Sequence, residues 1–279
     1  MITPDVLLPL WEAHRDAIHH PVRTFELAGR TFDDRPYQLG VINLSRDSTY
    51  RESIAHDVPA ALYRARRMTV EGAVMIDIGA ESTGTNADIV DVDAQLASLL
   101  PVLDALLAEG LLVSIETYLT DVAVAALEAG AQVINLTGRV DDPALYEAIA
   151  RHDARLILCY TPGETARSKD ELPSADVLID EQLAFFAERL ELATSSGVER
   201  IWIDPGFGFA LNLPDVLKPV VVKGRAALLR AGPELRGGLA RDAGQVIAQD
   251  VDFGGALLVA EQDDGVGNAL AHGIICQVQ

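Results

Sequence analysis

The chain has 279 residues, of which 49% are hydrophobic and 5% aromatic, and its formal net charge is −20. This acidic balance argues against nucleic acid as a partner and against docking on an anionic membrane, because both need clustered basic residues. No apolar run approaches the roughly 18 residues of a membrane span, and residues 1–16 lack the basic region of a signal peptide. Two cysteines are too few for a disulfide framework or a thiolate metal site. We therefore expect a soluble, cytoplasmic protein.

Strand and helix patterns alternate along most of the chain. Residues 1–38 are expected to form an extension, an N-terminal helix followed by a short β-hairpin that turns at residues 28–30. Beyond them, runs rich in β-formers alternate with Ala- and Leu-rich helical stretches. The strands are predicted at 39–43, 73–79, 111–117, 131–135, 154–160, 200–204, 219–224 and 255–262.

Eight strand–helix steps joined by right-handed crossovers predict an α/β fold, a (β/α)8 TIM barrel, with residues 1–279 as a single domain. A doubly wound open sheet is the alternative, but no G-x-G-x-x-G motif follows the first strand. The interval 205–219 is too short for a full helix. Either that helix is reduced, or the segment after it is helical and the seventh strand lies elsewhere.

The predicted strands share one feature, a polar or reactive residue near the carboxyl end. In a barrel these ends meet at one rim, where active sites are built. Burying a carboxylate without a partner is costly, so such a ring indicates a polar ligand or mutual pairing. Carboxylates and amides at the rim would suit a flat heterocycle rich in N–H donors. The residues are Asn43, Asp77, Glu116, Asn135, Cys159, Asp204, Lys223 and Glu261.

Four segments occur in the order of the motifs of the pterin-binding barrel family, and in particular of the dihydropteroate synthases. They are "GVINLSRDS", "MIDIGAESTG", "VSIETYLTDVAVAALEAGAQVIN" and "IDPGFGF". Members of the family they resemble are (β/α)8 barrels. Dihydropteroate synthases join a pterin methyl diphosphate to 4-aminobenzoate and release pyrophosphate with the help of Mg²⁺.

The resemblance assigns a pterin-binding set. Glu116, Asn135 and Asp204 are similar to the three residues that hold the pterin ring, and Phe209 is similar to a residue that packs on it. Glu116 stands where an Asp is usual, one methylene longer with the same charge. Folate-dependent methyltransferases share this trio, so it implies a pterin ligand without selecting the reaction.

The first two loops keep part of the pattern for handling diphosphate. Asn43 resembles the Asn that contacts diphosphate and Mg²⁺, which makes it the expected metal ligand. Asp47 and Thr83 resemble loop residues of the catalytic site. Gly84 stands where the synthases have an Arg, and glycine cannot supply a bidentate phosphate contact.

The last third of the chain departs further from the synthases, which carry Ser-Arg-Lys after the seventh strand and Arg-x-His at the eighth. Lys223 is the nearest candidate for the missing lysine and the third expected catalytic residue. Glu261 stands among the positions of the basic residues, where its negative charge would repel pyrophosphate.

These features favour a homodimeric transferase of folate biosynthesis, similar to dihydropteroate synthase, with pterin binding kept and its activity altered. One alternative is a folate-dependent methyl or one-carbon transferase, which needs no diphosphate site. Another is a non-catalytic pterin-binding paralogue. A barrel aldolase that forms a Schiff base on Lys223 is a fourth hypothesis, unrelated to pterins.

Overall fold

The computed structural model describes residues 12, 25–33, 37–48, 51–83, 87–161, 163, 175–204, 206, 256–260 and 271–278. Its strands in these ranges are β1 (Phe25–Leu27), β2 (Arg30–Phe32), β3 (Tyr37–Asn43), β4 (Ala73–Gly79), β5 (Val113–Thr117), β6 (Val133–Thr137), β7 (Arg155–Cys159), β8 (Ile201–Asp204), β9 (Ala256–Ala260) and β10 (Ala271–Val278). Its helices are α3 (Val58–Glu71), α4 (Val92–Ala108), α5 (Thr120–Glu128), α6 (Pro143–Arg151) and α7 (Ala175–Ser195), with a short 3-10 turn, η1, at Arg51–Ser53.

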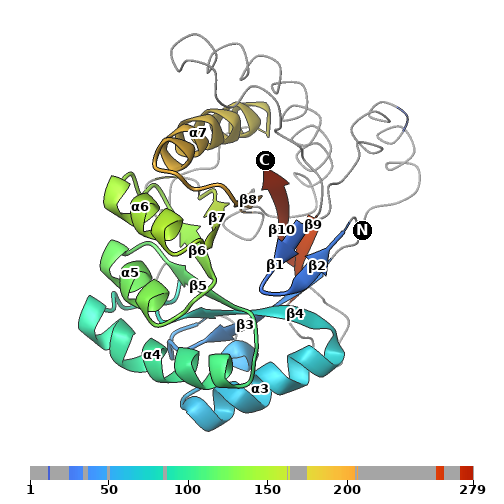
Figure 1. Ribbon diagram of the computed structural model, residues 1–279, viewed down its shortest axis with the longest axis vertical. Helices are drawn as coiled ribbons and strands as arrows, with labels where there is room; N and C mark the ends of the chain where they lie inside the picture. Colours follow the sequence, from blue (N-terminus) through green and yellow to red (C-terminus); the bar gives the residue numbers. More distant parts are fainter. Residues whose placement is uncertain are drawn as a thin grey trace.

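The strands form a closed barrel (Figure 1), which confirms the predicted α/β barrel class. Strands β3 to β8 pair in chain order and run parallel, and β9 pairs in parallel with β3. Strand β10 closes the barrel between β8 and β9 and is antiparallel to both. Only residues 261–270 separate β9 from β10, and a connection this short favours reversal of the chain over a parallel crossover.

The sequence predictions at the two ends of the chain have different outcomes. The hairpin predicted within residues 1–38 is confirmed as β1 and β2, which pair antiparallel. The N-terminal helix and the strand predicted at 219–224 lie outside the described residues. Strand β10 was not predicted from the sequence.

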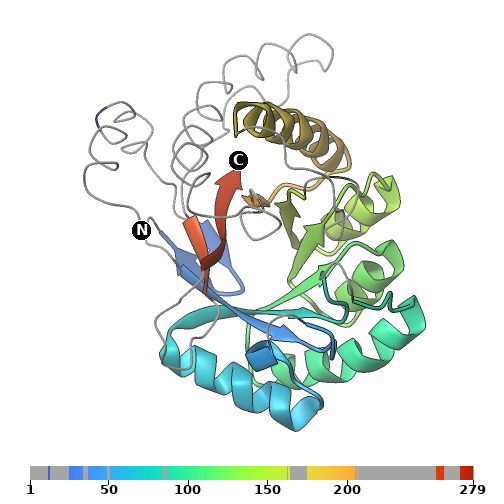
Figure 2. The ribbon, with the colours of Figure 1, turned by 180° about the vertical axis from the view of Figure 1, so that it is seen from behind.

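Helices α3 to α7 lie on the outer side of the curved sheet, as both views show (Figures 1 and 2). Aspartates begin three of them, with the side chains of Asp57, Asp91 and Asp142 accepting backbone N–H groups of the first turn. The outward side chains of the strands, such as Ile76, Ile78 and Ile115, are buried with those of the helices in one core. Within the described ranges, no helix has the length and hydropathy needed to cross a membrane.

The amino-terminal end of the barrel is filled largely by apolar side chains, together with the buried Arg155, whose guanidinium lies 4.6 Å from the centre of the Trp202 ring. Leu27 and Phe32 of the hairpin pack in one cluster with inward-facing residues of the barrel strands, and the Phe32 and Trp202 rings are 6.3 Å apart. Nη1 of Arg30 donates to the backbone oxygen of Val74 at 2.9 Å, which ties the hairpin to β4. The inward-facing acidic and amide side chains, by contrast, lie toward the carboxyl ends of the strands.

Candidate functional site

Six of the eight polar strand-end residues predicted from the sequence lie in described strands. Glu116 is in register with Gly79 on one side and with Asn135 on the other, and Cys159 is in register with Asp204. Asn43 is the last residue of β3 and is paired with Gly79. The strands therefore bring the predicted rim together at the carboxyl end of the barrel. Lys223, Glu261 and Phe209 lie outside the described residues.

Asp204 is held by two hydrogen bonds. Its Oδ1 accepts from the backbone N–H of Gly206 at 2.8 Å, and its Oδ2 lies 3.5 Å from Sγ of Cys159. Burial, together with the charge of Asp204, raises the pKa of the Cys159 thiol well above its ordinary value. The thiol therefore keeps its proton and acts as a weak donor to the carboxylate.

Glu116 is half-buried and accepts a hydrogen bond on Oε1 from the hydroxyl of Thr137. Thr137 is two residues beyond Asn135 on β6, so both side chains point into the barrel. The donor restrains one oxygen of the long glutamate side chain. Sequence reasoning missed Thr137, although the period-two alternation after Asn135 was available as a signal.

Asp77 and Asn135 are paired across β5, with Nδ2 of Asn135 donating to Oδ2 of Asp77 at 3.2 Å. Burial raises the pKa of Asp77 to about 6, an effect partly offset by the neighbouring Ser114 and Asn135 side chains. Among the described residues, Oδ1 of Asn135 is buried and has no hydrogen-bond partner, while the hydroxyl of Ser114 lies beside Asp77 and helps to lower its pKa. Buried polar atoms are seldom left in this state, so the cluster favours a polar occupant such as a ligand or water.

The loop after β3 carries the first pair of predicted residues. Nδ2 of Asn43 donates to Oγ of Ser53 at 2.7 Å, which turns Oδ1 of Asn43 away from Ser53. Asp47 is exposed, and its backbone N–H donates to Oγ of Ser45 at 3.3 Å. An amide oxygen is a suitable ligand for Mg²⁺, which commonly keeps several waters and binds substrate phosphates. Within the ranges described, no three His, Cys, Asp or Glu side chains cluster in a metal-binding arrangement.

The loop after β4 is anchored by Glu81, which the sequence prediction also missed. Its buried carboxylate accepts from the hydroxyl of Tyr118 at 2.6 Å, from Nε2 of Gln95 at 3.0 Å and from the backbone N–H of Val90 at 3.0 Å. These bonds fix both ends of the loop that carries the half-buried Thr83. The partners are far apart in the chain, so the local sequence contains no signal for this network.

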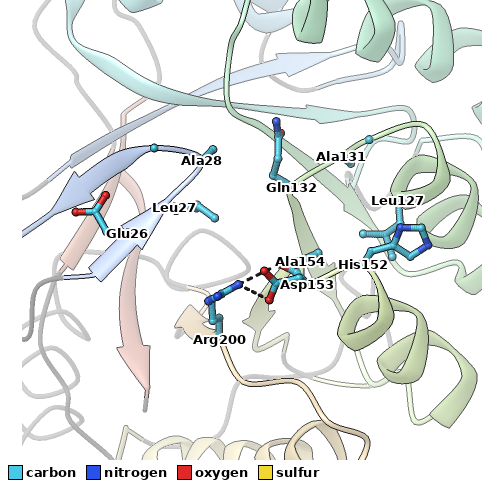
Figure 3. A pocket seen from close by; sticks show the side chains of 12 residues that line it. Glu26, Leu27, Ala28, Leu127, Ala131, Gln132, His152, Asp153, Ala154 and Arg200 are labelled. Carbon is cyan, nitrogen blue, oxygen red and sulfur yellow. Dashed lines mark hydrogen bonds and ion pairs between the residues drawn. The ribbon is translucent and has the colours of Figure 1, made fainter.

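A separate cavity of about 340 Å³ lies at the opposite end of the barrel (Figure 3). It is lined by hairpin residues such as Glu26 and by the segments that precede β6, β7 and β8. Arg200 and Asp153 form an ion pair on its wall. None of the predicted site residues lines this cavity, so the candidate site is the polar rim at the carboxyl ends.

Comparison with known proteins places the chain in a family. Residues 39–218 match the family described as "Pterin binding enzyme". A dihydropteroate synthase from Synechocystis sp. is 33% identical over 215 residues, which cover 75% of this chain and 71% of that protein.

Two crystal structures of dihydropteroate synthase from Thermus thermophilus are similar in fold. The complex with 6HMPPP is 34% identical, with a TM-score of 0.53 over 77% of this chain and 74% of that chain. The complex with 4-aminobenzoate is 32% identical, with a TM-score of 0.54 over 77% of this chain and 75% of that chain.

Proposed function

The chain belongs to the pterin-binding enzyme family, and we propose that it is a transferase of folate biosynthesis that condenses a pterin methyl diphosphate with 4-aminobenzoate. The observation that supports this proposal is the strand register, in which Glu116, Asn135 and Asp204 lie at the carboxyl ends of strands of one barrel. Solved relatives with 6HMPPP and with 4-aminobenzoate support both substrates.

Recognition of the pterin would rest on three acceptors. Asp204 is oriented by Gly206 and Cys159, and a carboxylate held in this way is suited to accept from a ring N–H and an amino group. Glu116 supplies a second carboxylate and Asn135 an amide. Hydrogen bonds to ionised carboxylates are the stronger kind, so the two acids would contribute most of the affinity and the amide the finer selection. Phe209 would pack on the same ring.

In the reaction, the amino nitrogen of 4-aminobenzoate attacks the methylene carbon of the pterin. The nitrogen–carbon bond forms as the carbon–oxygen bond to diphosphate breaks, and the amine proton is released with pyrophosphate. Asp47 and Thr83 lie on the loops after β3 and β4, from which they can close over the second substrate. Asn43 would hold Mg²⁺ through Oδ1, and the ion would supply positive charge to the departing diphosphate.

Three further features belong to the same proposal. Lys223 is the proposed basic residue near the diphosphate, although the family's other basic positions there are not kept. We also propose a homodimer and a cytoplasmic location, on the family resemblance and the composition.

Pyrophosphate release provides the direct test. The purified chain is mixed with the pterin methyl diphosphate and Mg²⁺, with and without 4-aminobenzoate. Release that depends on 4-aminobenzoate supports the synthase reaction. Pterin binding without such release would contradict it and favour the non-catalytic or one-carbon alternative, consistent with Gly84 and Glu261.

A further inference from the structure

A tyrosine beyond the end of β5 is bonded to the loop that follows β4. Gly79 and Glu116 are register partners at the carboxyl ends of these two strands. Glu81 lies two residues beyond Gly79, and Tyr118 lies two residues beyond Glu116. The hydroxyl of Tyr118 donates to Oε1 of Glu81 at 2.6 Å. The segment that carries the candidate pterin ligand Glu116 is therefore joined directly to the loop after β4.

The second carboxylate oxygen of Glu81 holds the far end of the same loop. Oε2 accepts from the backbone N–H of Val90 and from Nε2 of Gln95, both at 3.0 Å. Nε2 of Gln95 also donates to the backbone oxygen of Val90 at 2.9 Å. Glu81 is 6% exposed and Gln95 is 2% exposed, so these bonds are shielded from water. Residues 81–90, the β4 loop, are thus closed at both ends by one side chain, and the bond from Tyr118 fastens that side chain to β5.

We propose that Tyr118 is a positioning residue for the second substrate, because its hydroxyl holds the β4 loop in the position from which Thr83 serves 4-aminobenzoate. This inference rests on the proposed function, in which Thr83 lies on a loop that closes over that substrate. Hydrogen bonds to a carboxylate are stronger than those to a neutral acceptor, so losing the hydroxyl shifts the β4 loop toward other positions. The second substrate then binds only to the fraction of molecules whose loop remains in place.

Tyr118→Phe tests the proposal, since it removes only the hydroxyl. In the pyrophosphate-release assay the KM for 4-aminobenzoate should rise about tenfold, because the apparent affinity falls in proportion to the competent fraction. The kcat should stay within about twofold, since a saturating second substrate selects the required loop position. Affinity for a reduced pterin without diphosphate should also stay within about twofold, because Glu116 keeps its bond from Thr137. A general loss of stability would not separate KM from kcat in this way.

A second measurement needs no substrate. The backbone N–H of Val90 is bonded to Glu81, so its hydrogen exchange reports whether the β4 loop is held. Exchange at Val90 should be about tenfold faster in Tyr118→Phe, because KM and exchange report the same loop equilibrium. Tyr146→Phe is the matched control, since it removes a hydroxyl that donates at 2.9 Å to the backbone oxygen of Val140, in the loop after β6. It should leave both quantities within about twofold of those of the unsubstituted protein.

The possible outcomes are distinguishable. An unchanged KM in Tyr118→Phe would overturn the positioning role for the second substrate, even with faster exchange at Val90. A raised KM with unchanged exchange would also overturn it, because the hydroxyl would then act on the substrate and not through the loop. If the unsubstituted protein releases no pyrophosphate, the proposed function is overturned instead, and exchange at Val90 still decides whether Tyr118 holds the β4 loop.

Discussion

The carboxylate of Glu116 lies against Gly79 of the neighbouring strand, where a Cβ atom would stand 2.7 Å from Oε2 of Glu116. The two residues are register partners on β5 and β4. Any side chain at position 79 would therefore occupy the space used by the carboxylate. Gly79 is required by the position of a candidate pterin ligand, and its backbone conformation is one that other residues adopt.

Gly79→Ala should accordingly weaken pterin binding about tenfold with little loss of stability. The atom it meets is at the end of a flexible side chain, so Glu116 moves aside at small cost and loses its alignment with the ring. Isothermal calorimetry with a reduced pterin gives the affinity, and urea unfolding gives the stability.

Gly72→Ala is the control for that experiment. Gly72 ends α3 with a φ angle of 115°, a conformation costly for alanine, and no candidate ligand lies near it. We expect about 1 kcal/mol of destabilisation there and unchanged pterin affinity. Equal effects of the two variants on pterin affinity would show that Gly79 acts only through stability.

Asp204→Asn should abolish the rise in melting temperature that a reduced pterin produces. The variant retains an oxygen for the N–H of Gly206 but replaces the charged Oδ2 by an NH₂ group. Losing a charge-assisted bond and opposing a ring donor with another donor should reduce affinity by about tenfold or more.

Thermal unfolding is followed with and without pterin, and Asp142→Asn at the cap of α6 is the matched variant that should keep the shift. If the unsubstituted protein shows no shift with any reduced pterin, the pterin assignment itself is wrong.

Much of the fold and part of this site could be predicted from the sequence. The strands predicted at 39–43, 73–79 and 200–204 are observed because buried parallel strands require unbroken apolar runs, and such runs are visible locally. Asn135 and Asp204 were identifiable because a polar residue ends each run. Strand β6 continues beyond its predicted end to Thr137. The prediction stopped at Asn135 because the threonine that follows could equally well begin a loop.

The remainder depends on contacts between distant parts of the chain. The Thr137–Glu116 and Tyr118–Glu81 bonds join different strands and loops, and no local pattern specifies such partners. The direction of β10 is likewise set by the short connection before it and by the edges of β8 and β9, and the composition of β10 carries no such information.

Asp77 should make the stability of the protein depend on pH. Its pKa is about 6 in the folded protein against an ordinary value of 3.8, so the folded state holds the proton more tightly than the unfolded chain. The stability contributed by this group is therefore greatest below pH 4 and is lost as pH rises through 6. Glu116, Asp204 and the Cys159 thiol face the same site and are present in both proteins when Asp77→Asn is compared with the unsubstituted chain.

The free energy of unfolding of Asp77→Asn, measured in urea between pH 4 and pH 8, should exceed that of the unsubstituted protein by an amount that grows with pH. The difference should approach at most about 3 kcal/mol above pH 6, the equivalent of the shift in pKa. A difference that does not vary with pH would contradict burial of the ionised carboxylate. A gain in stability would mean that this buried charge is kept for a reason other than stability.

Gly84→Arg should strengthen binding of the pterin methyl diphosphate about tenfold without changing the affinity for a pterin that lacks the diphosphate. The position lies outside the described residues, and the expectation comes from the family pattern, in which an Arg stands here. A guanidinium offers two parallel donors to phosphate oxygens, whereas glycine offers none.

Two further substitutions at this position separate charge from geometry. Gly84→Gln adds a polar side chain without charge and should have little effect. Gly84→Lys adds the charge without the paired donors of a guanidinium and should have an intermediate effect. Equal gains with Arg and Gln would exclude a charge effect, and no gain with Arg would place the loss of diphosphate affinity elsewhere, with Glu261 as the next substitution to reverse.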